Sequence, residues 1–457
     1  MWWGLLTLIL AVSVVVMVRF GPVAALGCGV LLSFLFPVWI TEGFMGVSID
    51  LRVGTALILL LANLFHPRRR ISWVFTAGDW AVFVLYIVHV ASDSWQDGFA
   101  LFLIPRAFGE WNLPYISGRL AIQNAQDWRW LTGIAAIVAT VCGLWATTEA
   151  ISRVNIGNPV FGARPEDRTP STALRGGFKR AEGPTRNAIW FGMVQTLLLP
   201  WTIAAGIRGL RGDGPAWWCA TPVLNLCGIA ATISRGPALA AIGMIYLTAV
   251  FCLPKFRNYL IVAGVVIAVA GFLLKDSAMA SLKKVEDLKW DSIQQPTEKV
   301  EFNGQQHEFN AISARWLTLY AYRPAIEQAG FLGFGTERTD TFPVNVPLGP
   351  DAKQTISAFW TIDCEYLLLI LRFGWAGVTA FTIVCICSIW RILNQTGYVT
   401  PEEKIMPLAI AATLISATLA LIVEWMPHDY GFMFLWLVGV ANGIRPSWPT
   451  KHRQFSV

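Results

Sequence analysis

Residues 224–250 read LNLCGIAATISRGPALAAIGMIYLTAV, in which two apolar runs are joined by a short turn that carries a single arginine, Arg235. Proline is favoured in the first turn of a helix, so Pro237 indicates that a second helix begins directly after the arginine. The stretch therefore predicts a helical hairpin with Ser234, Arg235 and Gly236 at its turn. Because a guanidinium keeps its proton, Arg235 needs an anion or water beside it.

Apolar runs of this kind recur along nearly the whole chain. Of its 457 residues, 55% are hydrophobic and 14% are charged, whereas soluble proteins carry about 25% charged residues. At roughly 20 residues per crossing, the runs predict about twelve or thirteen transmembrane helices. We therefore expect an all-α polytopic membrane protein with a large, partly helical loop outside the membrane. The 8 cysteines show neither a disulfide framework nor zinc-ligand spacing. We expect no metal and no cofactor.

The distribution of basic residues predicts the orientation of these helices, because loops rich in Lys and Arg stay on the cytoplasmic side. The short basic loops cover residues 66–70, 207–212, 253–258, 390–395 and 445–453. Alternation then places two long polar loops, 151–188 and 275–358, on the outer face. The rest of the chain is predicted to form N-terminal helices (1–150), central helices (189–274), C-terminal helices (359–445) and a cytoplasmic tail (446–457).

Further arginines are predicted on the outer face. The stretch RAEGPTRNAIWFG (180–192) carries Arg180 and Arg186 into the membrane entry, and ARWLTLYAYRP (314–324) carries Arg315 and Arg323. Guanidinium groups bind phosphate oxygens bidentately, and the helix N-terminus after Gly236 adds partial positive charge. These features predict a site for the phosphates of a lipid headgroup. The alternative interpretation is that the arginines are ordinary helix-end residues that reach toward the membrane surface.

Two carboxylates begin the apolar helix in TIDCEYLLLILRFGWAG (361–377). Asp363 and Glu365 are stabilised there by the helix N-terminus alone. On the outer face, however, such a carboxylate can also accept a proton from a sugar hydroxyl, which is general-base chemistry. We therefore take both as candidate catalytic residues beside the interpretation that they are structural.

Three other features have simpler interpretations. The segment GFLGFGT (330–336), with Gly333 and Gly335, is not taken as a dinucleotide motif, because no strand is predicted before it and no helix after it. Arg106 and Glu110 are predicted to pair across one helical turn and to line a cavity, either as a structural pair or at the edge of a lipid-phosphate site. His428, on another outer turn, could approach the site, but the simpler interpretation is an ordinary surface residue.

Four of these segments, in this order, resemble the O-antigen ligase and O-antigen polymerase superfamily. They are EGPTRNAIWFGMVQTLLLPW (182–201), ISRGPALAAI (233–242), ARWLTLYAYRPAIEQAGFLGFGT (314–336) and DCEYLLLILRFGWAG (363–377). The resemblance implies a metal-independent membrane glycosyltransferase in the bacterial inner membrane. Such an enzyme takes a glycan from an undecaprenyl-diphosphate donor at the periplasmic face. It passes the glycan to a hydroxyl of a glycan, lipid or protein acceptor.

The resemblance also implies roles for single residues. Arg235 and Arg315 match the arginines that contact the donor diphosphate. The family's H-N-x-Y-L motif falls on residues 363–367, where Tyr366 and Leu367 match. Asp363 and Cys364 replace the histidine and the asparagine, and a carboxylate can take over proton acceptance from an imidazole.

Two hypotheses from other classes remain open beside the enzyme. The chain is either a transferase, a non-catalytic transporter or binder of anionic lipid-linked polysaccharide, or an inactive relative that lost the motif histidine. Transporters often show repeated halves and broken helices at the middle of the bilayer, and the sequence shows neither. Restoring histidine at Asp363 and measuring transfer would separate an inactive relative from an Asp-based enzyme.

Overall fold

The computed structural model describes most of the chain, namely residues 1–44, 47–66, 73–122, 125–162, 174–175, 177–273, 299–302, 305–308, 318–319, 322–339, 362–396 and 404–443. These residues are mostly helical, with three short antiparallel hairpins. The predicted fold class, an all-α polytopic membrane protein, is confirmed. The chain forms two compact units, one from residues 1–123, 294–391 and 417–443 and the other from 124–293, 392–416 and 444–457.

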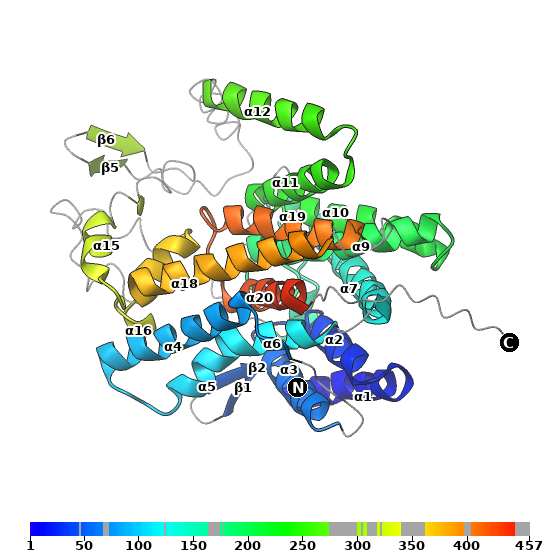
Figure 1. The fold of residues 1–457 in the computed structure, drawn as a ribbon, viewed down its shortest axis with the longest axis horizontal. Coiled ribbons are helices and arrows are strands. Elements are labelled where there is room, and N and C mark those ends of the chain that lie inside the picture. The colour runs from blue at the N-terminus through cyan, green and yellow to red at the C-terminus, as the bar shows by residue number, and fades with distance from the viewer. Residues whose placement is uncertain are drawn as a thin grey trace. The chain divides into compact units, whose positions relative to one another are not determined.

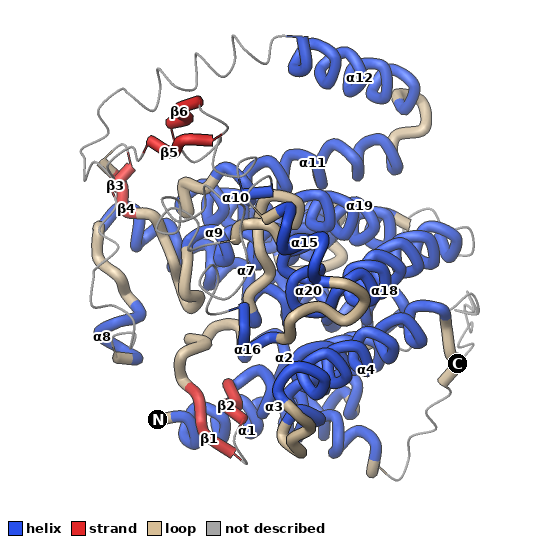
Figure 2. The backbone as a smooth tube through the Cα atoms, turned by 90° about the vertical axis from the view of Figure 1, so that its left-hand side faces the viewer, coloured by secondary structure: helices blue, strands red, loops and turns tan. Residues whose placement is uncertain are grey.

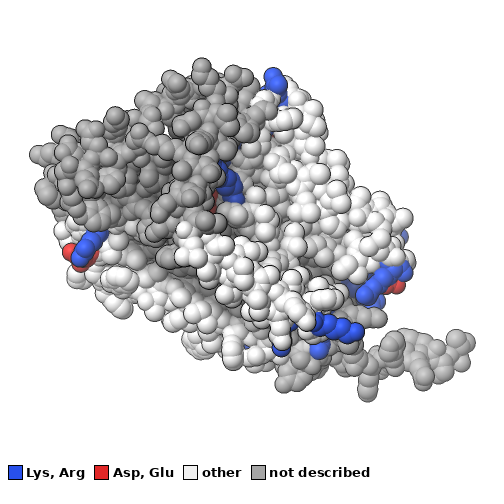
Figure 3. Space-filling model, turned by 90° about the horizontal axis from the view of Figure 1, so that it is seen from above, with Lys and Arg blue, Asp and Glu red and all other residues white. Residues whose placement is uncertain are grey.

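Five described helices are long and apolar enough to cross a membrane: Trp2–Phe20, Asp127–Ser152, Ala188–Leu210, Arg235–Cys252 and Glu365–Gln395. Shorter apolar helices accompany them, and the predicted total of about twelve or thirteen crossings stays a prediction. Large apolar side chains such as Val262 and Ile267 are exposed, as expected for a surface that meets lipid. Figure 3 shows few charged side chains on the described part of the face it presents.

The first unit contains most of the N-terminal helices together with the start of the C-terminal ones (Figure 1). Its helical elements are α1 (Trp2–Phe20), α2 (Pro22–Ser33), α3 (Leu51–Leu64), α4 (Ala77–Asp97), α5 (Leu103–Ala107), the π-helix η1 (Phe108–Asn112), α6 (Leu113–Leu120), α15 (Arg323–Ala329), α16 (Thr336–Thr339), α18 (Glu365–Gln395, to Arg391 in this unit) and α20 (His428–Gly443). Its hairpins pair β1 (Thr41–Phe44) with β2 (Val47–Asp50) and β5 (Lys299–Phe302) with β6 (Gln305–Glu308).

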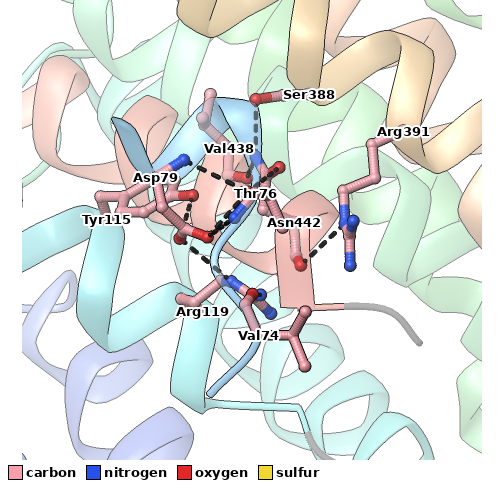
Figure 4. Close-up of polar contacts among 9 residues, drawn as sticks. All are labelled: Val74, Thr76, Asp79, Tyr115, Arg119, Ser388, Arg391, Val438 and Asn442. Atoms are coloured by element: carbon pink, nitrogen blue, oxygen red, sulfur yellow. Dashed lines mark hydrogen bonds and ion pairs between the residues drawn. The ribbon is translucent and has the colours of Figure 1, made fainter. Parts of the chain in front are cut away.

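A buried polar network ties the elements of this unit together (Figure 4). Asp79 on α4 accepts hydrogen bonds from the Tyr115 hydroxyl (2.7 Å) and from Arg119 Nε (3.3 Å), both on α6. Asn442 on α20 donates to Ser388 Oγ on α18 at 2.7 Å. Ionisable groups within membrane helices are usually functional or paired. Asp79 is paired, so this network serves packing.

The second unit contains the predicted arginine turn (Figure 2). Its helical elements are α7 (Ala125–Ser152), α8 (Gly157–Phe161), α9 (Ala188–Leu210), the 3-10 helix η2 (Ala216–Ala220), α10 (Thr221–Ala231), α11 (Arg235–Cys252), α12 (Arg257–Leu273) and α19 (Ile405–Ala420, to Ser416 in this unit). Its hairpin pairs β3 (Leu174–Arg175) with β4 (Phe178–Lys179). Buried apolar residues of α9, α10, α11 and α19 form one cluster around Met244.

Candidate functional site

The predicted hairpin turn is present and its backbone is strained. Helix α10 ends at Ala231 and α11 begins at Arg235, with Ser234 as its N-cap. Ile233, between the helices, has φ of +47°. A positive φ is a genuine outlier for a β-branched residue. Such strain persists only where the surroundings hold it, and it clusters at functional sites.

The segment before α9 holds this turn in place. Arg180 donates from Nη2 to Ser234 Oγ at 2.8 Å and from Nε to the Thr232 carbonyl at 3.4 Å. The neighbouring Ala181 amide donates to the Ala231 carbonyl at 3.1 Å. At least part of the Arg180 guanidinium is thus used to fix the turn that presents Arg235.

The segment before α9 is itself anchored by a buried carboxylate on α7, that of Glu149. One oxygen of Glu149 accepts from the amides of Glu182 (3.0 Å) and Gly183 (3.1 Å). The other accepts from Trp145 Nε1 (2.8 Å) and the Ile156 amide (3.0 Å). Four N–H donors thus satisfy both oxygens of this buried carboxylate. Sequence reasoning missed Glu149 because an acid at a helix end is unremarkable; its only signal was a carboxylate closing a long apolar run.

Replacing Glu149 by glutamine is expected to loosen the segment around Glu182. An amide keeps only one acceptor oxygen, and its NH2 group would face backbone donors, which costs about 1–3 kcal/mol per unsatisfied group. We expect faster hydrogen exchange of the Glu182 and Gly183 amides in the detergent-solubilised protein. Thr148→Val is the control, because the exposed Thr148 hydroxyl donates to its own helix at Leu144. Equal exchange in both variants would show that Glu149 does not anchor the segment.

Two of the predicted arginines emerge from neighbouring helix N-termini in this unit. Arg186 immediately precedes Asn187, the N-cap of α9, and Arg235 opens α11. The helices touch closely at these ends, since a β-carbon on Gly192 would lie 2.6 Å from Pro237 Cβ. Both arginine side chains are exposed. Two guanidinium groups beside two helix N-termini are suited to a phosphate-bearing anion.

In the first unit, the motif at the start of α18 is bound to the turn before α20. The Glu365 amide donates to the carbonyls of Leu421 (3.0 Å) and Glu424 (3.2 Å). The Glu365 carboxylate accepts from the Met426 amide at 2.8 Å and is buried, which is an anchoring role. Asp363 is only half-buried. Tyr366 donates its hydroxyl to the Thr418 carbonyl at 3.1 Å.

The glycine segment is built into a kink of α18. Gly374 has φ of 63° and ψ of −164° inside that helix, and the amides of Phe334 and Gly335 donate to the carbonyls of Leu371 (2.7 Å) and Arg372 (2.9 Å). Gly333 and Gly335 also have positive φ, 73° and 78°. The expectation that no helix follows was wrong, because α16 opens at Thr336. The start of α16 is capped by a carboxylate from a distant part of the sequence.

The capping carboxylate comes from α4. Asp93 accepts from the Thr336 amide (2.7 Å) and from its hydroxyl (2.6 Å). Nearby, Ser92 Oγ donates to the carbonyls of Leu332 and Arg372, and Gln96 donates to that of Gly333. These hydrogen bonds from α4 explain why the short helix α16 forms where the local sequence predicts none.

Other predicted arginines have different places. Arg315 lies outside the described residues, so its predicted meeting with Arg235 stays a prediction. Arg323 is largely exposed at the start of α15 and pairs with Glu327 at 3.0 Å. The pairing of Arg106 with Glu110 was wrong: Arg106 pairs with Glu337 at 2.5 Å. Glu110 lies in the π-helix η1, so residues four apart do not have the relative positions that they would have in an α-helix.

One histidine of the first unit, His428, faces a buried carboxylate, that of Asp50. His428 Nε2 lies 3.4 Å from Asp50 Oδ2, with the Asp50 side chain buried and the His428 side chain 39% exposed. Burial raises the pKa of the Asp50 carboxyl, but His428 and then Arg52 outweigh it and hold this pKa below its ordinary value. Burial lowers the pKa of His428, but the facing Asp50 carboxylate outweighs it, and the net pKa lies above the ordinary value.

The fold defines a multi-pass helical membrane protein, and one of its helical hairpins carries the exposed Arg235 at a strained turn. Residues 220–382 match the family model described as O-antigen ligase, which confirms the predicted family resemblance. The match contains Arg235, Gly333, Asp363 and Tyr366. Among the curated proteins, nothing matches the chain. The family match supports an O-antigen ligase-like function and indicates glycosyltransferase-type activity.

Proposed function

We propose that the protein transfers a glycan from an undecaprenyl-diphosphate donor to an acceptor hydroxyl at the periplasmic face of the bacterial inner membrane. The observation that carries this proposal is the strained turn with the exposed Arg235, at the start of a helix that packs closely against α9, the helix that Arg186 precedes. Arg180 holds this turn in a strained conformation, and Glu149 anchors the segment that carries Arg180. The strain supports a functional role for Arg235, which we propose to be stabilising the charge of the leaving diphosphate.

In this reaction the acceptor oxygen attacks the anomeric carbon while the bond from that carbon to the diphosphate breaks. The electron pair leaves with undecaprenyl diphosphate, whose developing charge Arg235 stabilises. Preorganised charge of this kind is usually the largest catalytic contribution. The family resemblance adds Arg315 to the diphosphate contacts and Asp363 to the acceptor side.

The test uses the purified protein in vesicles with lipid-linked glycan extracted from a strain that lacks it, together with the envelope glycolipid fraction of that strain as acceptor. We expect release of undecaprenyl diphosphate and a new glycosidic bond. Movement of labelled glycan across the vesicle membrane without any bond change would instead establish the transporter. Long chains accumulating in the deletion strain would indicate a ligase, and single repeat units a polymerase.

A further inference from the structure

The missing motif histidine leaves the acceptor hydroxyl without an imidazole at residue 363. The first unit contains another imidazole, on the turn that is bound to the motif. His428 opens α20 two residues after Met426, whose amide donates to the Glu365 carboxylate at 2.8 Å. The Glu365 amide in turn donates to Leu421 and Glu424 on the same turn. His428 therefore stands on the segment that the motif helix fixes.

The environment of His428 is that of an oriented base. Asp50 faces Nε2 at 3.4 Å and is itself fixed, because its other oxygen accepts from the Val53 amide at 2.8 Å. Arg52 Nη1 lies 3.9 Å from the same oxygen of Asp50, Oδ2. No hydrogen bond to His428 Nδ1 occurs among the described residues. A base within reach of solvent that faces a fixed carboxylate is the arrangement that nucleophile activation uses.

Resting on the proposed function, we infer that His428, rather than Asp363, is the general base for the acceptor hydroxyl and that Asp50 is its positioning residue. The acceptor O–H proton passes to His428 Nδ1 as the acceptor oxygen bonds to the anomeric carbon. The carbon–diphosphate bond breaks, and its electron pair leaves with the diphosphate. The neutral imidazole becomes an imidazolium, which the Asp50 carboxylate stabilises.

The sign of the pH dependence follows from this role. A base acts in its neutral form, so transfer rises with pH through the pKa of His428. The charged groups that face His428 are Asp50, Arg52 and Glu110. Asp50 and Glu110 favour the protonated imidazole, whereas Arg52 opposes it. Removing the charge of Asp50 is therefore expected to move the rising limb of the pH profile to lower pH.

The experiment compares His428→Gln and Asp50→Asn in the vesicle transfer assay across pH. We expect His428→Gln to slow transfer by at least about 100-fold, the usual contribution of a general base. Asp50→Asn preserves the cap of α3, since asparagine caps a helix as well as aspartate, and should shift the profile. His66→Gln, just beyond the other end of α3, is the matched control and should transfer like the wild type.

A second measurement does not depend on activity. Diethyl pyrocarbonate modifies neutral imidazole, so the pH midpoint of His428 modification, followed by mass spectrometry, should fall in Asp50→Asn. An unchanged midpoint, or full transfer by His428→Gln, would overturn the inference while wild-type transfer still upholds the proposed function. Wild-type protein that transfers nothing would overturn both.

Discussion

Arg235→Ala is expected to slow glycan transfer by about 100- to 1,000-fold, as removal of one preorganised charge-stabilising group does. The loss should fall mainly on kcat, because Arg235 meets charge that grows as the diphosphate leaves. Arg235→Lys should recover part of the rate, since lysine supplies the charge without the bidentate fork. Initial rates of transfer from lipid-linked glycan in vesicles measure the loss in Arg235→Ala and the recovery in Arg235→Lys.

The matched control for this variant is Arg257→Ala. Arg257 opens α12 and is exposed, so its loss removes the same charge at another helix N-terminus. It should transfer glycan at nearly the wild-type rate. If Arg235→Ala and Arg257→Ala behave alike, the diphosphate is not held by the strained turn, and the proposed function loses the observation that carries it.

The parts that sequence predicted well are those governed by local chemistry. Apolar length predicted membrane helices, and Pro237 after Arg235 predicted a helix that begins at the turn. Arg180 could not be placed in the same way. As a loop arginine it resembled Arg186, and only the fold brings its guanidinium to Ser234.

The parts that sequence could not predict depend on contacts between distant segments. Asp50 and His428 lie near opposite ends of the chain, and their pairing needs α3 and α20 to be side by side. The helix at Thr336 needs Asp93 from α4. Arg106 and Glu110 were misassigned because the spacing of four residues assumes an α-helix, whereas η1 is a π-helix.

Gly374→Ala is expected to detach the glycine segment from α18. Its φ and ψ fall in a region that essentially only glycine occupies, and forcing another residue there costs about 1–3 kcal/mol. A β-carbon would also lie 2.3 Å from the Phe331 carbonyl oxygen, which no rotamer relieves because both atoms belong to the backbone framework. Four backbone hydrogen bonds join the segment to α18, donated by the amides of Phe334, Gly335, Trp375 and Ala376. They should weaken together.

Hydrogen exchange measures this directly. A loss of about 3 kcal/mol corresponds to about a 100-fold change in an opening equilibrium, so the Phe334 and Gly335 amides should exchange about that much faster. Gly109→Ala is the control, because the nearest atom to its β-carbon would be Val53 Cγ1 at 3.9 Å. Transfer should fall with the loosened segment, since the start of α18 carries Asp363. If the Phe334 amide exchanges at the wild-type rate in Gly374→Ala, the kink tolerates a side chain, and the hydrogen bonds between the glycine segment and α18 do not depend on glycine.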